Sequence, residues 1–444
     1  MVTIISALRQ VREDLVELLD RTTINQLCRE LGHSWRDRKL DPYTMLHLFI
    51  LQVLNNNTAM THLPHLSGER FTSSAYCQAR QRLPLALLER LVKQFARRLD
   101  DPEEVPRWRG HRVLLEDGSG FSMPDTAELQ SYFGQPGNQK PGCGFPVAHM
   151  LALMDAEAGL LREVIVRPLR TQDFAIAAQL YPGLTAGDLL IGDRGFCSYA
   201  HLALILQADL HGVFRVHQRI KVDFRPQRPC ASQAGPGHPT SRWIRRLGHH
   251  DQLVEWRKPK SPPVWMSPEQ FAQLPETIIV REIKWRIRES CHRVRKVILV
   301  TTLLDPERYP AAEIARLYGL RWQMEVDLRD LKITLGMDVL KGHSVDVVMK
   351  EVQVFVLVYN LIRLVTLKAA RVQHVKPHRI SFIDALRWLQ PPKPKQALLD
   401  LVVNPQRPGR IEPRCIKRHM KEYDLMTRPR HILRNRLKKR RNAA

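Results

Sequence analysis

Two aspartates far apart in the chain have settings that could hold a divalent metal ion. Asp117 follows the apolar run VLLE and precedes Gly118, and Asp193 follows DLLIG and precedes Arg194-Gly195. We expect each at the carboxyl end of a buried strand, where a following glycine allows a sharp turn. A carboxylate there needs a partner, and a hard cation is a good one. An aspartate that merely caps a turn is the alternative for either residue alone.

A third acid lies on a helix predicted over residues 310–336. Along it, Tyr318, Arg321, Glu325 and Lys332 fall at positions i, i+3, i+7 and i+14. At about 100° per residue these positions share one face of the helix. A carboxylate flanked by cations suits a metal site at which Arg321 and Lys332 contact phosphates. The alternative is a surface stripe held by ion pairs such as Arg321–Glu325.

The chemistry that such a set could perform is phosphodiester cleavage. A cut needs an activated water and a stabilised leaving oxygen, and two Mg2+ ions about 3.5–4 Å apart supply both. Mg2+ prefers carboxylate oxygens, and three acids can bridge and flank such a pair. This chemistry needs no side-chain nucleophile, so none of the 18 histidines or 7 cysteines is assigned a catalytic role.

Charge and composition indicate a soluble protein that meets a polyanion. The 444 residues include 69 Lys or Arg against 45 Asp or Glu, a net charge of +24. DNA or RNA is the commonest partner of such a basic protein, although charge can also serve solubility alone. The segment from Pro405 to Ala444 holds 14 Lys or Arg and 3 Asp or Glu, which leaves +13 on the rest of the chain. The tail therefore does not account for the whole imbalance.

Cysteine usage and apolar runs point to the cytoplasm. The seven cysteines are odd in number, widely spaced and without a Cys-x-x-Cys pair, which argues against a zinc ribbon or a disulfide framework. The longest uncharged apolar stretch, residues 352–362, is far shorter than the roughly 20 residues that cross a bilayer. We expect a cytoplasmic, nucleoid-associated protein that does not enter a membrane.

Hydrophobic periodicity divides the chain into helical and mixed regions. We expect an N-terminal helical DNA-binding domain, in which FTSSAYCQARQRLP presents Arg80 and Arg82 either to phosphates or to solvent. The apolar runs that follow predict strands and helices in mixed order, and the stretch DDPEEVPRWRGH reads as a linker. The predicted boundaries are 1–105 for the helical domain, 106–218 for the first part of a catalytic core, 219–292 for a β-rich insertion, 293–371 for the second part of the core, and 372–444 for a helical and basic tail whose last forty residues are loop-like.

These motifs resemble those of a known family. Tyr318, Arg321, Glu325 and Lys332 reproduce, at the family spacing, the YREK signature of DDE transposases of the insertion-sequence-4 family. DGSGFSMPDT, beginning at Asp117, resembles the block around that family's first aspartate. IGDRGFCSY resembles the second block, and QKPGCGFP is also similar. The resemblance covers roughly residues 20 to 390 in ordered blocks.

The resemblance implies a fold and a role for each residue. The fold is α/β, a ribonuclease-H-like mixed sheet flanked by helices, with a β-rich insertion between the second and third acids. The metal-binding and catalytic triad is Asp117, Asp193 and Glu325, with Asp117 as the bridging ligand. Arg321 and Lys332 contact DNA phosphates near the cleaved end, and Tyr318 helps to position that strand. Five nearby acids are expected to be structural: Asp125, Asp155, Asp188, Asp327 and Asp330.

The implied activity is that of a DNA transposase. It would bind the terminal inverted repeats of its insertion sequence, cleave the ends by two-metal hydrolysis, and join the 3′-hydroxyl to target DNA. Two Mg2+ ions are implied, with Mn2+ able to substitute, and so is a homodimer on double-stranded DNA. The alternatives are a metal-dependent nuclease without strand transfer and a decayed relative that only binds DNA. Trp256, Trp265 and Trp285 are candidates for stacking on a flipped base, worth about 1–3 kcal/mol, or are ordinary strand aromatics.

Overall fold

The computed structural model describes most of the chain. The described residues are 11–98, 105–229, 237–287, 295–390, 401–404 and 428–442, apart from the single positions 12, 37, 138, 172 and 402. Part of the predicted linker, residues 99–104, and most of the predicted tail lie outside the described residues. Among the cysteines, Cys28, Cys77, Cys143 and Cys197 are free thiols.

The N-terminal region is helical, as its periodicity predicts. Asp41 caps one helix by accepting a 2.8 Å hydrogen bond from the Thr44 backbone N–H, and Pro42 begins that helix, where its missing N–H costs nothing. The helices are α2 (Glu13–Leu18), α3 (Arg21–Glu30), α4 (Pro42–Leu54), α5 (Leu63–Ser67), α6 (Ser73–Arg82) and α7 (Leu85–Arg98).

One prediction about α6 is wrong. Arg80 is buried, with its guanidinium 5.2 Å from the centre of the Phe49 ring, so it is not presented to a phosphate backbone. Arg82, two residues later, is exposed. Because residues two apart on a helix face different directions, the two arginines cannot share one surface.

The centre of the molecule is a mixed sheet. Across the described residues, nine strands form one sheet in the order β3-β2-β1-β4-β5-β9-β8-β7-β6. The first part consists of β1 (Val113–Ser122), β2 (Val147–Asp155), β3 (Leu161–Pro168), β4 (Leu189–Gly192) and β5 (His211–Arg215). The antiparallel neighbours β1, β2 and β3 are followed by β4 and β5, which run parallel to β1. This order and these directions are those of a ribonuclease-H-like sheet, as expected.

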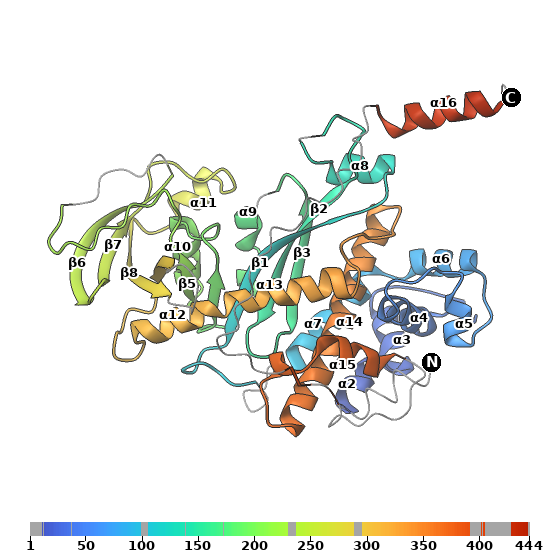
Figure 1. The fold of residues 1–444 in the computed structure, drawn as a ribbon, viewed down its shortest axis with the longest axis horizontal. Coiled ribbons are helices and arrows are strands. Elements are labelled where there is room, and N and C mark those ends of the chain that lie inside the picture. The colour runs from blue at the N-terminus through green and yellow to red at the C-terminus, as the bar shows by residue number, and fades with distance from the viewer. Residues whose placement is uncertain are drawn as a thin grey trace.

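The predicted β-rich insertion continues the same sheet. Its strands are β6 (Thr240–Gly248), which the sequence pattern did not predict, β7 (Asp251–Arg257) and β8 (Thr277–Ile287), with the short helix α11 (Pro268–Ala272) before β8. They join the core through β9 (Arg295–Thr301), which pairs with β8 on one side and β5 on the other. Figure 1 shows β6, β7 and β8 at the end of the molecule farthest from the N-terminal helices.

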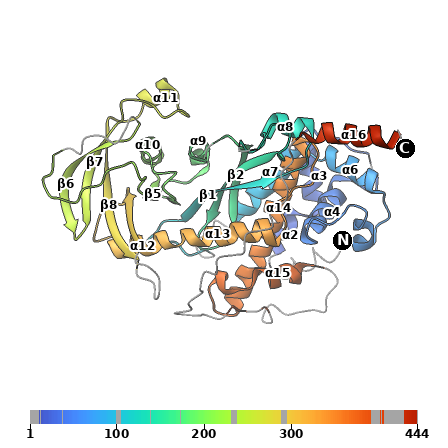
Figure 2. The same ribbon diagram turned by 45° about the horizontal axis from the view of Figure 1, so that its top comes forward.

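The long helix predicted over residues 310–336 is divided into three parts. It consists of α12 (Ala311–Gly319), α13 (Arg321–Arg329) and a π-helical turn over Asp330–Thr334. Figures 1 and 2 show α12 and α13 running in line across one face of the sheet. The π turn is wider than an α turn, so the even rotation of 100° per residue assumed for this helix does not extend to Lys332.

A second helix in this region, predicted over 345–371, is α14 (Val345–Val372). It is long and apolar enough to cross a bilayer, but 89% of its apolar window is buried inside the protein. It packs against α4, α7, α15 (Phe382–Leu389) and β3, and thus forms the centre of the larger hydrophobic core. The remaining described α-helices are α8 (Ala127–Phe133), α9 (Asp173–Ala177), α10 (Tyr199–Gln207) and α16 (Arg430–Asn442).

The C-terminal part differs from its prediction. Residues 430–442 form a helix, although the last forty residues were expected to be loop-like. Its first residue, Arg430, donates to the carboxylate of Asp125 at 3.2 Å and stacks 3.9 Å above the centre of the Phe145 ring. Figure 1 shows α16 extending outwards from the neighbourhood of α8. Basic residues at helical spacing can form such a helix once one end is anchored.

Candidate active site

Asp117 lies in the middle of a strand rather than at its end. It pairs with Ala152 on β2, and Gly118 pairs with Leu151, so β1 continues without a turn to Ser122. The expectation of a sharp turn at Gly118 is therefore wrong. The apolar run VLLE stops at Asp117 because the strand emerges from the core there, not because the strand ends. The Asp117 side chain is 24% exposed, which leaves its carboxylate accessible.

Asp193 directly follows β4, as expected, and is level with Asp117. Leu115 on β1 pairs with Ile191 on the parallel strand β4, and each aspartate comes two residues later. Neighbouring strands are about 4.8 Å apart, so this register places the two carboxylates on adjacent strands at one height. The distant positions 117 and 193 are therefore brought together by strand pairing.

The glycine that matters at this site precedes Asp193. A Cβ added to Gly192 would lie 2.8 Å from a carboxylate oxygen of Glu116 and 3.0 Å from the Phe196 and Phe214 rings. Nothing lies within 4 Å of a Cβ added to Gly195. The end of β4 is therefore packed so tightly that only hydrogen fits in front of Asp193.

Helix α13 brings Glu325 to the same place through Arg321. The helix packs against β1. One guanidinium nitrogen of Arg321 lies 2.8 Å from a carboxylate oxygen of Glu325, and another lies 3.7 Å from one of Asp117. The Arg321 side chain is 11% exposed and that of Glu325 is 45% exposed. A single guanidinium thus spans the first and third acids of the predicted triad.

The electrostatics link Asp193 to the same cluster. Burial, and then the charge of Asp193, raise the pKa of Tyr318 to about 12, so its phenol stays protonated at neutral pH. Burial by itself would lower the pKa of Arg321. The neighbouring groups of Tyr318 and Glu325, and the charge of Asp193, outweigh burial and raise that pKa above its ordinary value. The permanently charged guanidinium offsets the repulsion that three neighbouring carboxylates would otherwise feel.

The chemical type of the donor atoms suits a hard cation, but the side chains must rearrange before they can hold one. All three side chains offer carboxylate oxygens, which Mg2+ prefers. Among the described residues, however, no three Asp, Glu, His or Cys side chains lie close enough to hold one ion. Arg321 supplies the positive charge beside Glu325 that a bound cation would supply. Glu325 is half-exposed, and its ion pair with Arg321 is the contact that would have to break before its carboxylate could join the aspartates.

The other predicted site residues lie apart from this cluster or behind it. Tyr318 is buried. Lys332 is half-buried within the π turn. Arg321 faces the acids, so the phosphate contact predicted for it requires the approaching strand to come to the carboxylates themselves. Arg215, which the sequence analysis did not single out, is close enough to influence the pKa of Tyr318. Its position as the last residue of β5, a strand parallel to β4, was the signal that could have identified it.

The nearby acids have structural partners, in line with their prediction. Asp188 accepts from the Arg112 guanidinium at 3.0 Å, and Asp155 accepts from the backbone N–H of Ala158 at 2.9 Å. Asp330 accepts from the Thr334 hydroxyl at 3.3 Å. Asp125 and Asp327 are ion-paired with Arg430 and Arg363. None of these five is needed to complete the triad.

The three candidate tryptophans have different surroundings. Trp256 is fully buried and its indole N–H donates to Glu282 at 3.0 Å, so it is a core residue and cannot receive a base. Trp265 is partly buried, with its ring centre 4.7 Å from that of His201. Trp285 is half-buried on β8. For Trp256 the reading as an ordinary strand aromatic is the correct one.

A protein class follows from the sheet, the three acids and the sequence comparison. The family described as the transposase DDE domain matches residues 108–361, more than half of the chain. The chain therefore belongs to the DDE transposase family. Along nearly its whole length it is similar to the transposase InsG of insertion sequence element IS4 from Escherichia coli (strain K12), with 25% identity over 446 residues and 94% coverage of each chain. The resemblance to the insertion-sequence-4 family is thus confirmed.

Two further similarities cover less or are more remote. InsZ from Escherichia coli (strain K12), whose name also describes it as a transposase, is 30% identical over 127 residues, which is 28% of this chain and 42% of that protein. A cryo-EM structure of the piggyBac transposase synaptic complex with hairpin DNA superposes with a TM-score of 0.41 and 10% identity. That superposition covers 83% of this chain and 75% of the other.

Proposed function

We propose that this protein binds the inverted repeats at the ends of its own insertion sequence, cleaves the DNA there and joins the freed 3′-hydroxyl to target DNA. The observation that carries the proposal is the convergence of Asp117, Glu325 and Asp193 around Arg321 in a DDE transposase. Action on DNA in the cytoplasm, in association with the nucleoid, and a homodimer that holds two ends belong to the same proposal.

Each residue of the cluster has a part in this reaction. Asp117, Asp193 and Glu325 would hold two Mg2+ ions, with Mn2+ as a substitute. When bound, such ions supply an activated water and stabilise the leaving oxygen. Asp117 lies on β1 and Asp193 directly follows the adjacent strand β4, so the pairing of these strands sets the separation of the two residues. Glu325 alone comes from a helix, and its exposed side chain can move between Arg321 and the aspartates.

Arg321 acts on the acids and on the DNA strand, and the buried Tyr318 acts through the neighbouring Arg321. The Arg321 guanidinium offsets the repulsion among the carboxylates, and it can donate to a phosphate once Glu325 leaves it. The Tyr318 phenol, neutral at physiological pH, can donate a hydrogen bond but carries no negative charge that would repel DNA. Lys332, one turn beyond the end of α13, is proposed to contact a phosphate farther along the strand.

The test is cleavage of DNA that carries the repeats flanking the reading frame. Asp193→Ala should retain DNA binding and lose Mg2+-dependent nicking, because it removes a metal ligand and no structural contact. Glu307→Ala, an exposed acid on the loop before α12, is the matched control and should nick like the wild type. Undiminished nicking by Asp193→Ala would refute the site assignment.

Joining is tested separately with pre-cleaved ends. A transposase should convert such ends and a supercoiled plasmid into strand-transfer products in a Mg2+-dependent way. Nicking without any joined product would identify a nuclease that does not transfer strands. DNA binding with neither reaction in the wild type would identify a decayed relative.

A further inference from the structure

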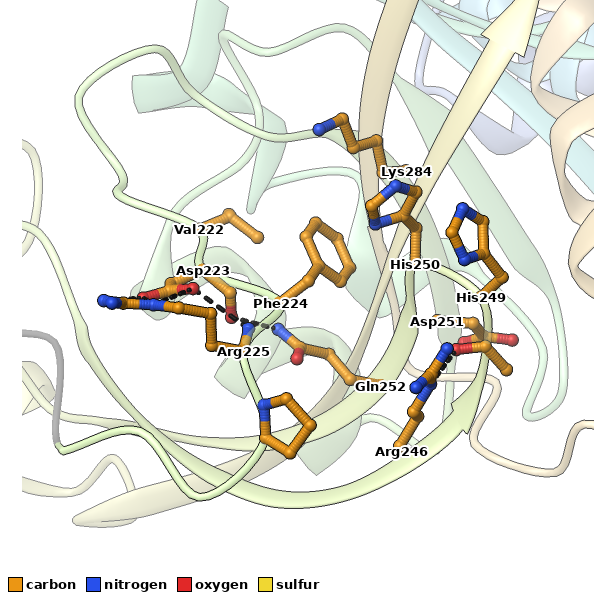
Figure 3. A pocket seen from close by; sticks show the side chains of 12 residues that line it. Val222, Asp223, Phe224, Arg225, Arg246, His249, His250, Asp251, Gln252 and Lys284 are labelled. Carbon is orange, nitrogen blue, oxygen red and sulfur yellow. Dashed lines mark hydrogen bonds and ion pairs between the residues drawn. The ribbon is translucent and has the colours of Figure 1, made fainter.

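A polar pocket of about 440 Å³ lies at the tip of the insertion, far along the sheet from the acids. It is formed by the segment Val222–Pro226, the turn between β6 and β7, and Lys284 on β8 (Figure 3). Figure 3 shows the Phe224 and His250 rings between Lys284 and Arg225. The two ring centres are 5.4 Å apart with the planes at 72°.

The two acids of this pocket are neutralised by arginines, whereas the charges of two of its cations are not neutralised. Asp223 pairs with Arg225 at 2.7 Å, and Asp251 pairs with the buried Arg281 at 2.6 Å. Arg246 uses its Nε atom to donate to the Gly248 carbonyl at 3.0 Å, which leaves its terminal nitrogens available. In the described part of the chain, the Lys284 ammonium has no acidic partner within 4 Å. The pocket therefore presents a net positive charge.

One histidine of the pocket, His250, has positively charged neighbours. The pKa of His250 is lowered, first by burial and then by the neighbouring charges of His249, Lys284, Arg286 and Arg246. The centre of the His249 ring lies 4.1 Å from that of His250. Burial is the larger cause, and the neighbouring cations add to it, so the charges around His250 favour an anion over a further cation.

The pocket walls are held by hydrogen bonds. Gln252 donates to the Asp223 carbonyl at 2.9 Å and is itself held by the buried Glu282 at 2.8 Å. The backbone N–H of Lys284 donates to the His250 carbonyl at 2.9 Å. The cations are therefore carried on a prearranged frame, which lowers the entropy that ligand binding would cost.

Strand register places the pocket at the same end of the strands as the catalytic acids. Arg246 pairs with Gln252 and Lys284 with Ile298, so both cations lie one position from the row of the acids and on the opposite face of the sheet. Arg215 pairs with Leu299, Leu299 with Ile283, Ile283 with Asp251, and Asp251 with Gly248. The same row reaches the two aspartates. Gly192 pairs with Phe214, so Asp193, one residue later, is level with Arg215. Leu115 pairs with Ile191, so Asp117, two residues later, is level with Asp193.

The length of this row matches a short stretch of DNA. Five strand spacings of about 4.8 Å separate Asp117 from Asp251, or roughly 24 Å. That is the length of about seven base pairs of duplex at 3.4 Å each. Further basic residues lie along the segments that leave β4 and β5, namely Arg194, Arg215, Arg219 and Lys221.

We propose that this pocket is a second DNA-contact site, in which Arg246 and Lys284 bind the phosphate backbone about seven base pairs from the position where the strand is cut. The inference rests on the proposed function, since it takes DNA as the ligand. A phosphodiester fits because it is anionic and has several acceptor oxygens that guanidinium and ammonium groups can contact.

The test measures binding of a random-sequence duplex of about 30 bp by fluorescence anisotropy over a range of salt concentrations. The pocket variant is the double substitution Arg246→Gln and Lys284→Gln. The control is Arg257→Gln with Lys260→Gln, two exposed cations at and just beyond the opposite end of β7, with the same change in net charge. Circular dichroism and thermal melting confirm that both variants fold.

The pocket variant should lose about two phosphate contacts. Its plot of log affinity against log salt should become shallower by about 1.8, while the control changes by less than half of that. Equal slopes for the two variants would overturn the inference. Calorimetric titration with inorganic phosphate adds a second arm: phosphate binding that only the pocket variant loses, with DNA binding unchanged in both, would identify a small-anion site and also overturn it.

The outcome is separable from that of the proposed function. Nicking is measured on the same wild-type preparation with Mg2+. Absence of nicking together with a shallower slope in the pocket variant would refute the proposed function and support the pocket as a DNA contact. Normal nicking with equal slopes would refute the pocket and leave the function standing.

Discussion

The ion pair between Asp327 and Arg363 fastens the helix that carries Glu325 to the core. Asp327 lies two residues after Glu325 on the opposite, buried side of α13, and Arg363 lies in the middle of α14. Arg363 also donates to the Tyr359 hydroxyl at 2.8 Å, and Gln323 donates to Asp327 at 3.1 Å. Burial lowers the pKa of Arg363 to about 9, so the guanidinium is still charged at neutral pH, and Asp327 is the acid with which it is ion-paired.

Removal of one charge should be strongly destabilising. Breaking a buried ion pair from one side costs about 3–5 kcal/mol, because the remaining charge is left without its partner. The retained amide oxygen of Asp327→Asn can still accept one hydrogen bond, so we expect a loss near 3 kcal/mol. Replacement of both partners, by Asp327→Leu with Arg363→Met, removes the unpaired charge and should recover more than half of that loss.

The assay is urea unfolding followed by tryptophan fluorescence, since Trp322 on α13 is half-exposed and reports on this helix. Nicking is measured in parallel at urea concentrations below the unfolding midpoint of the variant. At these concentrations the nicking activity of Asp327→Asn should be lower than that of the wild type, because Glu325 is then less firmly placed. Asp330→Asn is the control and should change the free energy of unfolding by less than about 1 kcal/mol, since its carboxylate is only half-buried. A loss below about 1 kcal/mol for Asp327→Asn, or a double variant as unstable as the single one, would refute this reasoning.

Three further predictions concern the site and the insertion. Lys332→Ala should weaken binding of the DNA ends and make its salt dependence shallower by about 1 in log–log slope, and an unchanged slope would mean that Lys332 does not contact phosphate. Gly192→Ala should cost about 1–3 kcal/mol in urea unfolding and reduce nicking, because the new methyl group collides with Glu116 and the Phe196 ring, whereas Gly195→Ala, placed in open space, should do neither. Burial raises the pKa of Glu282 above its ordinary 4.5, so folding takes up protons there and its contribution to stability falls as the pH rises through the raised pKa. Glu282→Gln should therefore gain stability relative to the wild type in urea curves from about pH 4 to about pH 8, and a difference that stays constant with pH would contradict this.

Local patterns in the sequence were sufficient to predict most helices and strands, and together with the family resemblance they nominated the three acids. The hairpin β2–β3, the strands β4 and β5, and helix α14 lie where hydrophobic periodicity places them. Such patterns are readable because an element buries its own apolar face whatever its neighbours are. The YREK spacing identified Tyr318, Arg321, Glu325 and Lys332 by residue type and resemblance.

The predictions failed where a neighbour determined the outcome. Arg80 was predicted to face phosphate or solvent, but α4 supplies a ring that covers it. Gly118 was expected to turn the chain, but pairing with β2 keeps β1 extended. Helix 310–336 is interrupted by a π turn at Asp330–Thr334, which the spacing of its apolar residues did not reveal.

The sequence by itself therefore determined most of the elements that form, the candidate acids of the triad and the strongly basic balance of the chain. Only the tertiary structure decided that the insertion extends the catalytic sheet, that Arg321 bridges Asp117 and Glu325, and that a basic pocket lies level with the acids. The physical reason is the distance along the chain over which each interaction acts. Backbone periodicity acts over a few residues. Charge pairing and strand register depend on segments up to about 200 positions apart, which meet only when the sheet is complete.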